Sequence, residues 1–356
     1  MSAHQPHPEI AFALPGDIHA RSGGTQYDRR VIETLRALGQ PVRHLALPAS
    51  WPAPDTTDTA ATLAQLRGLP QDMPVIIDGL AFGAMQTRDV AALDRRVIVM
   101  LHHPLGLETG LAEARAAELI TREAANLRHA AHVIVPSGHI KTILGQQFGV
   151  EGTRVTVAPP GFDRTAPALP RPRKDDPPLI LTVGLICERK GHDVVLRALG
   201  KIAELDWCSV IVGAVQDAAL LSRLKGVRDD LGLRHRVHFP GEMSPQALSD
   251  YYSRAHVFAL ATRYEGYGMV LSEAQLHGLP IVTCATGAVP ETLRGAGLLV
   301  QPDDVDAFAQ ALRRLLTDAA THDILSRESQ MAGATLPHWR DTAHIFQQVI
   351  GNHAAQ

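Results

Sequence analysis

The sequence contains few cysteines and no long apolar run. Three of its 356 residues are cysteines, far apart and in apolar surroundings: Cys187, Cys208 and Cys284. This odd and dispersed set excludes a disulfide framework and a zinc site built from paired cysteines, and it predicts reduced thiols in the cytoplasm. No run of about 18 apolar residues occurs, and residues 1–16 lack a basic segment followed by an uninterrupted apolar stretch. We therefore expect neither a membrane span nor a signal peptide.

Net charge is also low, and several well-known motifs are missing. The formal net charge is -3 and the sequence pI is near 6.6, which argues against binding to nucleic acid through an extended positive field. Any anion site must therefore be local. The sequence has no G-x-S-x-G, H-E-x-x-H, Walker or D-x-D motif, and its 18 histidines are scattered without ligand spacing. We predict no metal site and no nucleic-acid partner, and membrane-surface association is not indicated.

The length and the pattern of apolar runs predict two domains. A chain of this size is expected to form two cores of roughly 150 to 180 residues each. Short apolar runs bounded by Gly or Pro alternate with longer helical patterns, which is typical of βα units and a parallel sheet. The fold class is therefore α/β, with two Rossmann-like domains whose parallel sheets are flanked by helices. The two series of runs are residues 10–16, 42–48, 74–80, 95–103, 132–137 and 154–160, then residues 179–184, 208–213, 236–241, 256–262, 280–286 and 297–302.

A proline-rich segment separates the two halves. Residues 167–178 read PALPRPRKDDPP, and this density of proline forbids regular structure and favours an extended connector. We place the first domain at residues 1–168 and the second at residues 169–336. Residues 337–356 show a helical pattern with no strand after it, and this helix could cross back to the first domain.

Two glutamates and two glycines follow the fourth apolar run of the second half. Residues 263–273 read RYEGYGMVLSE, which places Glu265 in a strand-to-helix turn and Glu273 inside the helix. Gly266 and Gly268 would let the backbone approach a ligand and present amide groups at a helix N-terminus, which suits phosphate. Because carboxylates suit hydroxyl groups, the combination fits a nucleotide-sugar. The alternative is an ordinary helix N-terminus in which glutamate interacts favourably with the helix dipole.

A basic pair follows the first apolar run of the second half. Arg189 and Lys190 lie at the start of a predicted helix, whose positive dipole end should repel them. A diphosphate would relieve this conflict, met by lysine as a point charge and by arginine as a fork. The alternative is that both side chains extend into solvent.

Histidines and glycines mark the corresponding edge of the first half. His102 and His103 follow a buried-type strand, where histidine can hydrogen-bond a sugar hydroxyl or transfer a proton near neutral pH. Gly23 and Gly24 follow the first strand and precede a helix, but the complete G-x-G-x-x-G or P-loop pattern is missing. The alternatives are structural histidines and a plain flexible loop.

Taken together, these residues resemble a retaining glycosyltransferase of family 4, the group with the GT-B architecture of two facing Rossmann-like domains. The resemblance covers nearly the whole chain and is strongest over residues 183–199, 237–293 and 297–312. It implies transfer of a hexose-type sugar from a nucleoside-diphosphate sugar, with UDP or GDP as the expected nucleotide, to an acceptor hydroxyl. No metal and no further cofactor are implied.

The family's functional residues map onto the second half residue by residue. In the family, the residue matching Glu265 lies by the donor sugar and the residue matching Glu273 binds the ribose hydroxyls. Arg189 and Lys190 match the basic pair that neutralises the diphosphate. The resemblance also implies that backbone amides contact the sugar and diphosphate between the two glutamates, at Gly266, Tyr267, Gly268, Met269 and Val270.

The remaining positions lie around the first strand of each half. Gly23 and Gly24 match the loop that approaches the diphosphate from the first domain, and His102 matches the histidine that contacts the donor sugar, with His103 as the alternative. Gly184, which ends the first strand of the second half, belongs to the expected donor site. Many members carry arginine after this glycine, whereas this chain has Leu185. We expect His102, Glu265, Lys190 and Arg189 to act in catalysis.

The residues also favour one reaction mechanism over another and leave a few alternative functions open. Front-face attack is favoured over double displacement, because the sequence shows no clear nucleophile at the edge of the first domain. The alternatives are a non-catalytic nucleotide-sugar-binding subunit, a GT-B epimerase or phosphorylase, and an NAD-dependent oxidoreductase, which would need a complete glycine fingerprint. A small molecule or saccharide is preferred over a lipid as acceptor, because the first half has no long apolar helix.

Overall fold

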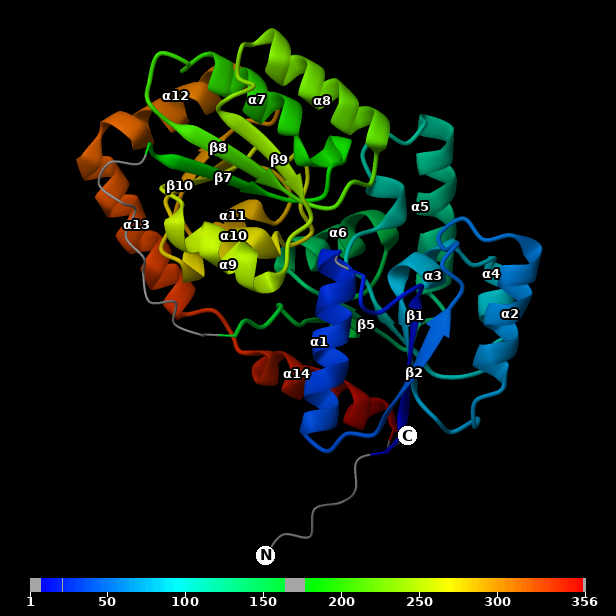
Figure 1. The fold of residues 1–356 in the computed structure, drawn as a ribbon. Coiled ribbons are helices and arrows are strands. Elements are labelled where there is room, and N and C mark those ends of the chain that lie inside the picture. The colour runs from blue at the N-terminus through cyan, green and yellow to red at the C-terminus, as the bar shows by residue number, and fades with distance from the viewer. Residues whose placement is uncertain (1–7, 21, 164–176, 355–356) are drawn as a thin grey trace, which may run out of the picture. The chain divides into compact units, whose positions relative to one another are not determined.

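The computed structural model describes residues 8–20, 22–163 and 177–354, which form two α/β units (Figure 1). The N-terminal unit comprises residues 1–163 and 337–356, and the C-terminal unit comprises residues 164–336. The predicted boundary at residues 168 and 169 lies outside the described residues.

The N-terminal unit is built on a parallel six-stranded sheet. Its strands pair in the order β2-β1-β3-β4-β5-β6, and each of the six lies within one of the predicted apolar runs. Side chains of β3 and β4 are buried throughout, as expected for a parallel sheet with both faces covered. The strands are β1 (Ile10–Pro15), β2 (Val42–Leu47), β3 (Val75–Asp78), β4 (Val97–Met100), β5 (His132–Val135) and β6 (Val155–Val157).

Helices connect these strands and cover the sheet. They are α1 (Gly23–Ala37), α2 (Thr56–Arg67), α3 (Gly79–Ala84), α4 (Thr87–Ala91), α5 (Glu113–Leu127) and α6 (Gly138–Phe148), with short 3-10 turns η1 (Leu105–Leu107) and η2 (Gly152–Arg154). Side-chain oxygens cap several of them; Ser22, for example, accepts a hydrogen bond from the amide of Thr25 at the start of α1.

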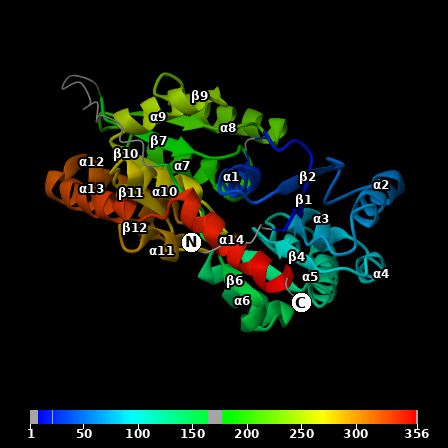
Figure 2. The same ribbon diagram turned by 90° about the horizontal axis from the view of Figure 1, so that it is seen from below.

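The C-terminal helix α14 (Trp339–Ala354) packs on the N-terminal unit, against α1 (Figure 2). The Trp339 ring meets the Tyr27 ring edge-on at a centroid distance of 5.7 Å, and the Phe346 ring stacks with Phe12 of β1 at 6.3 Å. The Thr342 hydroxyl donates to the Pro159 carbonyl at 2.8 Å. These contacts confirm that the last helix crosses back to the first domain.

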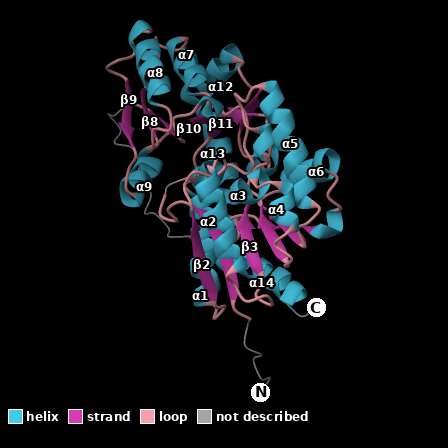
Figure 3. Cartoon of the chain, turned by 90° about the vertical axis from the view of Figure 1, so that its right-hand side faces the viewer, coloured by secondary structure: helices cyan, strands magenta, loops and turns pink. Residues whose placement is uncertain are grey.

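The C-terminal unit repeats the architecture with a second sheet (Figure 3). Its strands are parallel and pair in the order β12-β11-β10-β7-β8-β9. Its strands are β7 (Leu179–Val183), β8 (Cys208–Val212), β9 (Val237–Gly241), β10 (Val257–Leu260), β11 (Ile281–Cys284) and β12 (Leu298–Val300). Its helices are α7 (His192–Gly200), α8 (Ala218–Asp230), α9 (Pro245–Arg254), α10 (Met269–Leu276), α11 (Val289–Leu293), α12 (Val305–Thr317) and α13 (Ala319–Ala334), and a 3-10 turn, η3 (Glu188–Lys190), precedes α7.

Each sheet has a point at which the strand order reverses. In the N-terminal unit the chain moves from β1 to β2 on one side of β1 and then returns to β3 on the other side. In the C-terminal unit it moves from β7 through β8 to β9 on one side and then returns to β10 on the other side of β7. Ligands of open α/β sheets bind outside the carboxyl ends of strands at such a reversal. The loops after β7 and β10, and those after β1, β3 and β4, are therefore where function is expected.

The three cysteines are free thiols, as their number and spacing predicted. No disulfide joins the three cysteines: Cys284 is buried in β11, and Cys187 and Cys208 are partly buried. Burial raises the pKa of the Cys284 thiol to about 12, so this residue behaves as a small apolar side chain. None of the helices in the described ranges is both long enough and apolar enough to cross a membrane.

Candidate functional site

The loop after β10 buries the first glutamate of the pair in an ion cluster. Glu265 is 5% exposed, and its Oε1 accepts from the Lys190 ammonium at 2.6 Å and from the Thr262 hydroxyl at 2.9 Å. The Arg189 guanidinium lies 3.5 Å from Oε2. Burial alone would raise the pKa of Glu265, but Lys190 and Arg189 outweigh it and hold the pKa below its usual value. Glu265 is therefore ionised, and the cluster of one carboxylate and two cations carries a net positive charge.

The basic pair does not extend into solvent. Lys190 is 8% exposed, and its aliphatic stem packs on Gly184, where an added Cβ would lie 3.3 Å from the lysine Cδ. Arg189 donates to the Tyr264 carbonyl at 3.0 Å. Gly191 ends the η3 turn with φ at +61°, and a Cβ there would lie 1.9 Å from the Ala261 carbonyl oxygen. Only glycine therefore lets the basic loop approach the end of β10 this closely.

Arg263, which sequence reasoning did not single out, ties the same loop together. Its guanidinium lies 3.1 Å from Asp193 and 2.7 Å from Asp303, and it also donates to the Glu188 carbonyl. The Arg263 amide donates to the Arg189 carbonyl at 2.7 Å. The loops after β7 and β10 are thus held to each other by both backbone and side-chain bonds.

The second glutamate is held by a buried tyrosine. Glu273 lies in α10, and its Oε2 accepts from the Tyr252 hydroxyl of α9 at 2.8 Å. The Tyr252 ring is itself fixed between two rings, nearly parallel to Phe258 at 17° and to His277 at 14°. Burial raises the pKa of Glu273, and the hydrogen bond from Tyr252 partly opposes this rise. One carboxylate oxygen is therefore committed to Tyr252, which leaves Oε1 for a ligand.

The backbone between the two glutamates opens toward the start of α10. Gly268 precedes the helix with φ at +91°, and no side chain caps this end. The first amides of a helix have no intrahelical partner, so those of Met269 and Val270 are suited to anionic oxygens. Behind the loop, Gly287 has φ at +54°, and a Cβ there would lie 2.3 Å from the Glu265 carbonyl oxygen. The segment after β11 thus supports Glu265 from the other side, a role that sequence reasoning missed.

In the N-terminal unit, His102 lies at the carboxyl end of the sheet among two carboxylates. Its Nε2 lies 2.9 Å from Asp28 Oδ1 and 3.9 Å from Asp78 Oδ2. Both aspartates are 3% exposed. Burial would lower the pKa of His102, but Asp28 and then Asp78 raise it above the usual value. Burial and the Asp28 charge raise the pKa of Asp78. One ligand atom from each of the three residues lies within 4.8 Å of the other two, which is also compatible with a bound cation.

Gly23 and Gly24 differ in their surroundings although they are adjacent. A Cβ on Gly24 would lie 3.2 Å from His102 Cδ2, whereas a Cβ on Gly23 would meet nothing within 4 Å. The structure therefore brings Gly24 and His102 together within one unit and leaves Gly23 apart. Asp28 and Asp78 were missed, and two signals could have indicated them: Asp78 ends a buried strand, and Asp28 lies one helical turn after Gly24.

His103 points to a different set of neighbours. Its Nε2 lies 4.0 Å from Glu108 Oε2, which is not one of the two carboxylates beside His102. The loop that carries both histidines is anchored by Glu123 of α5, which is fully buried and accepts from the Leu105 amide at 3.0 Å. Burial raises the pKa of Glu123 to about 8, so this residue is protonated at neutral pH.

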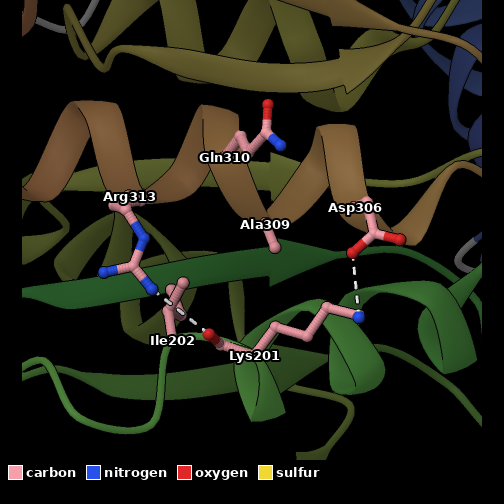
Figure 4. A pocket seen from close by; sticks show the side chains of 6 residues that line it. All are labelled: Lys201, Ile202, Asp306, Ala309, Gln310 and Arg313. Atoms are coloured by element: carbon pink, nitrogen blue, oxygen red, sulfur yellow. Dashed lines mark hydrogen bonds and ion pairs between the residues drawn. The ribbon is translucent and has the colours of Figure 1, made fainter.

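A surface pocket elsewhere in the C-terminal unit has a different character (Figure 4). Its ionic groups are already paired: Lys201 Nζ lies 2.8 Å from Asp306, and Arg313 donates to the Lys201 carbonyl at 3.2 Å. Because Lys201 follows the C-terminal end of α7 and the basic loop precedes its N-terminal end, the pocket lies away from the cluster of Glu265. The pocket is lined by Lys201, Ile202, Asp306, Ala309, Gln310 and Arg313.

Comparison with solved structures identifies the fold class. The chain superposes on sucrose-phosphate synthase from Thermosynechococcus elongatus with a TM-score of 0.81 at 22% identity, covering 98% of this chain and 100% of that one. It also superposes on HepE from Anabaena in complex with UDP-glucose, with a TM-score of 0.71 at 18% identity and coverage of 98% and 100%. Together with the two parallel sheets, these likenesses show that the protein has the GT-B fold.

Comparison with family models and curated proteins identifies the family. Residues 169–331 match the model "Glycosyl transferases group 1", and residues 22–166 match the model "Glycosyltransferase Family 4". The chain therefore belongs to the group 1 and family 4 glycosyltransferases that these two models describe. It is 29% identical over 265 residues to a GDP-mannose-dependent alpha-(1-6)-phosphatidylinositol monomannoside mannosyltransferase from Mycolicibacterium smegmatis, covering 69% of this chain and 65% of the relative.

A second relative is similar over a shorter stretch. The chain is 32% identical over 187 residues to a D-inositol 3-phosphate glycosyltransferase from Xylanimonas cellulosilytica, covering 48% of this chain and 45% of the relative. Across eight such curated relatives the match spans between 37% and 65% of their length, or about half.

Proposed function

We propose that the protein transfers a hexose-type sugar from a nucleoside-diphosphate sugar to an acceptor hydroxyl with retention of configuration and without a metal. The observation that carries this proposal is the cluster of Glu265, Lys190 and Arg189 where the strand order of the C-terminal sheet reverses. Two preorganised cations share one buried carboxylate, so the cluster has a net charge of opposite sign to a diphosphate leaving group. Such groups stabilise charge that develops in the transition state.

The two glutamates take different parts of the donor. Glu265 is ionised and bound to Lys190, and it orients the cations beside the donor sugar. Glu273 keeps one carboxylate oxygen for the ribose hydroxyls, because Tyr252 holds the other. The amides at the start of α10 contact the diphosphate oxygens. Support comes from the order of these groups along the chain, which follows that of the family.

In the N-terminal unit we assign the sugar contact to His102 rather than His103. His102 lies at the carboxyl end of β4 beside Gly24, whereas His103 Nε2 lies 4.0 Å from Glu108 Oε2. The sequence shows no clear nucleophile at this edge, and the structure places two carboxylates there, Asp28 and Asp78. Both are 3% exposed and directed at His102, so neither is free to attack an anomeric carbon. Front-face attack, in which the leaving phosphate oxygen takes the acceptor proton, therefore remains the favoured route.

The donor and acceptor are proposed at the level of class. UDP and GDP are the favoured nucleotides, since one relative is named GDP-mannose-dependent and a protein of the same fold was solved with UDP-glucose. A small polyol or saccharide is the favoured acceptor. A non-catalytic binding subunit is the alternative from another class, and it predicts nucleotide binding without turnover.

The first test is a thermal-shift series with UDP, GDP, ADP and NAD at equal concentration. A ligand at about 100 times its dissociation constant adds roughly 2.7 kcal/mol of stability. We expect one nucleoside diphosphate to raise the melting temperature. Stabilisation by NAD alone, or by none of the four, would contradict the assignment.

The second test follows release of the nucleoside diphosphate from its glucose and mannose conjugates, with inositol, disaccharides and water as acceptors, and NMR of the product anomer. We expect turnover with retained configuration, and inversion would contradict the mechanism. The Lys190→Ala variant should lose turnover, and Lys201→Ala is its matched control, since Lys201 pairs with Asp306 at the surface away from the cluster.

A further inference from the structure

One face of α1 packs against the imidazole of His102. Gly24, Tyr27 and Asp28 are spaced i, i+3 and i+4, so they lie on the same side of the helix. Gly24 gives the ring room, the Tyr27 ring meets it edge-on at 5.1 Å and 81°, and Asp28 Oδ1 lies 2.9 Å from Nε2. A helix that served only to cover the sheet would not need a glycine and a buried carboxylate here.

Asp28 is costly for the fold unless it is paired. A buried carboxylate loses its hydration, and its partners must replace it. Asp28 faces His102 on one side and Asp78 on the other, and Asp78 is held in turn because its Oδ1 accepts from the Leu80 amide at 2.8 Å. The pair of aspartates therefore forms a fixed acceptor at a definite edge of the imidazole.

The geometry selects between the two nitrogens of the ring. His102 approaches Asp28 and Asp78 through Nε2. Because the carboxylate accepts, Nε2 must carry the proton, and Nδ1 is then the nitrogen left to meet a ligand. Without Asp28 the ring could adopt either tautomer and could rotate about its bond to Cβ.

We propose that Asp28 is a positioning residue that fixes the orientation and tautomer of His102, so that Nδ1 is the atom presented to a hydroxyl of the donor sugar. This inference rests on the proposed function for the sugar contact. Asp78 lies near the same nitrogen, with Oδ2 3.9 Å from Nε2, and in this proposal it does not contact the ligand.

The experiment uses the full chain and four forms: wild type, Asp28→Asn, His102→Ala and the double variant. Glu33→Gln is the matched control, because Glu33 lies on the exposed face of the same helix. Circular dichroism and the melting temperature verify folding. Isothermal titration with UDP, GDP and ADP gives Kd, and release of nucleoside diphosphate from the corresponding glucose and mannose conjugates gives kcat and KM.

We expect Asp28→Asn to reduce kcat at least about tenfold while Kd stays within about twofold, since the side chains proposed to bind the ribose and the diphosphate, Glu273, Lys190 and Arg189, lie in the C-terminal unit. The double variant should be no slower than His102→Ala, because Asp28 acts through His102. A full kcat in Asp28→Asn, or losses that multiply in the double variant, would overturn the proposal.

A spectroscopic measurement separates this inference from the proposed function. Nitrogen-15 NMR of the imidazole, assigned by its loss in His102→Ala and recorded at a pH above the raised pKa of His102, where the ring is neutral, should show a proton on Nε2 in wild type and a mixture of tautomers in Asp28→Asn. The result is independent of turnover: if no nucleotide binds, the proposed function fails while the tautomer test stands. An unchanged tautomer in Asp28→Asn overturns the inference. So does a stoichiometric metal ion in wild type, measured by plasma mass spectrometry, that is lost in Asp28→Asn.

Discussion

Replacing Tyr252 by Phe removes a single hydroxyl from the candidate nucleotide site. That hydroxyl donates to Glu273 Oε2 at 2.8 Å and to the Val270 carbonyl at 3.4 Å. The ring that carries it is 3% exposed and stacks with Phe258 and with His277. Phenylalanine fills the same space, so the stacking should persist. The change therefore removes the short hydrogen bond that orients the glutamate together with the long one to Val270.

The expected magnitude comes from preorganisation. The hydrogen bond exists before a ligand arrives, so its loss weakens binding only through the added freedom of the Glu273 side chain. Ordering one flexible side chain costs roughly 0.5–1.5 kcal/mol, and about 1.4 kcal/mol corresponds to a tenfold change in Kd. We expect about a fivefold increase in Kd at neutral pH. Since the bond also opposes the raised pKa of Glu273, the effect should grow as pH falls and more of the carboxyl is protonated.

Isothermal titration with the preferred nucleoside diphosphate and its 2′,3′-dideoxy analogue distinguishes this reasoning from a general loss of structure. The dideoxy analogue lacks both ribose hydroxyls, so its Kd should not respond to Tyr252→Phe. Tyr251→Phe is the matched control on the same helix, because the contact of Tyr251 is with the Arg254 guanidinium at 6.0 Å. An equal loss for both ligands, or no loss for either, would refute a ribose-binding role for the Tyr252 and Glu273 pair.

Three further predictions concern stability and turnover. Glu123→Gln should leave the free energy of unfolding near pH 5 almost unchanged but make the protein more stable than wild type by roughly 4 kcal/mol at pH 9. The reason is that folding raises the pKa of Glu123 from 4.5 to about 8, so the unfolded wild-type chain releases its proton at a lower pH than the folded chain does. Urea unfolding across pH measures this difference, and a difference that does not depend on pH would count against the burial argument. Gly191→Ala should prevent folding or lower the free energy of unfolding by several kcal/mol, because the new Cβ would lie 1.9 Å from a carbonyl oxygen. Gly149 also has a positive φ, +66°, but open space around it, so Gly149→Ala should cost only about 1 kcal/mol. Equal losses in thermal melts of the two variants would show that the close approach at Gly191 is not tight. Lys190→Ala should lower kcat at least about tenfold relative to Lys201→Ala, and equal rates would remove the ion cluster from the mechanism.

The fold was largely predictable because its signals are local. Buried strands of a parallel sheet appear as short apolar runs, and all twelve runs correspond to strands. The prediction that the last helix returns to the first domain was also confirmed, although the pattern alone left its packing partner open. Tyr27 and Phe12 decide it, since they meet Trp339 and Phe346 of α14.

The candidate site was predictable at the positions that follow strands. Glu265, Arg189 and Lys190 were expected from their place at strand ends, and the structure brings all three together. What the sequence could not show was that Lys190 is bound to Glu265, because 75 residues separate them and their contact depends on β7 pairing with β10.

The two α/β halves, the family and the chemical types of residue at each sheet edge were predictable without a structure, since these follow from local periodicity and spacing. Which of those residues meet became clear only from the folded chain. Asp28 faces His102 across 74 residues and Tyr252 faces Glu273 across 21, and neither pair has a shared local pattern. Such contacts arise from strand order and from helix faces, and these are fixed only when the whole sheet is assembled.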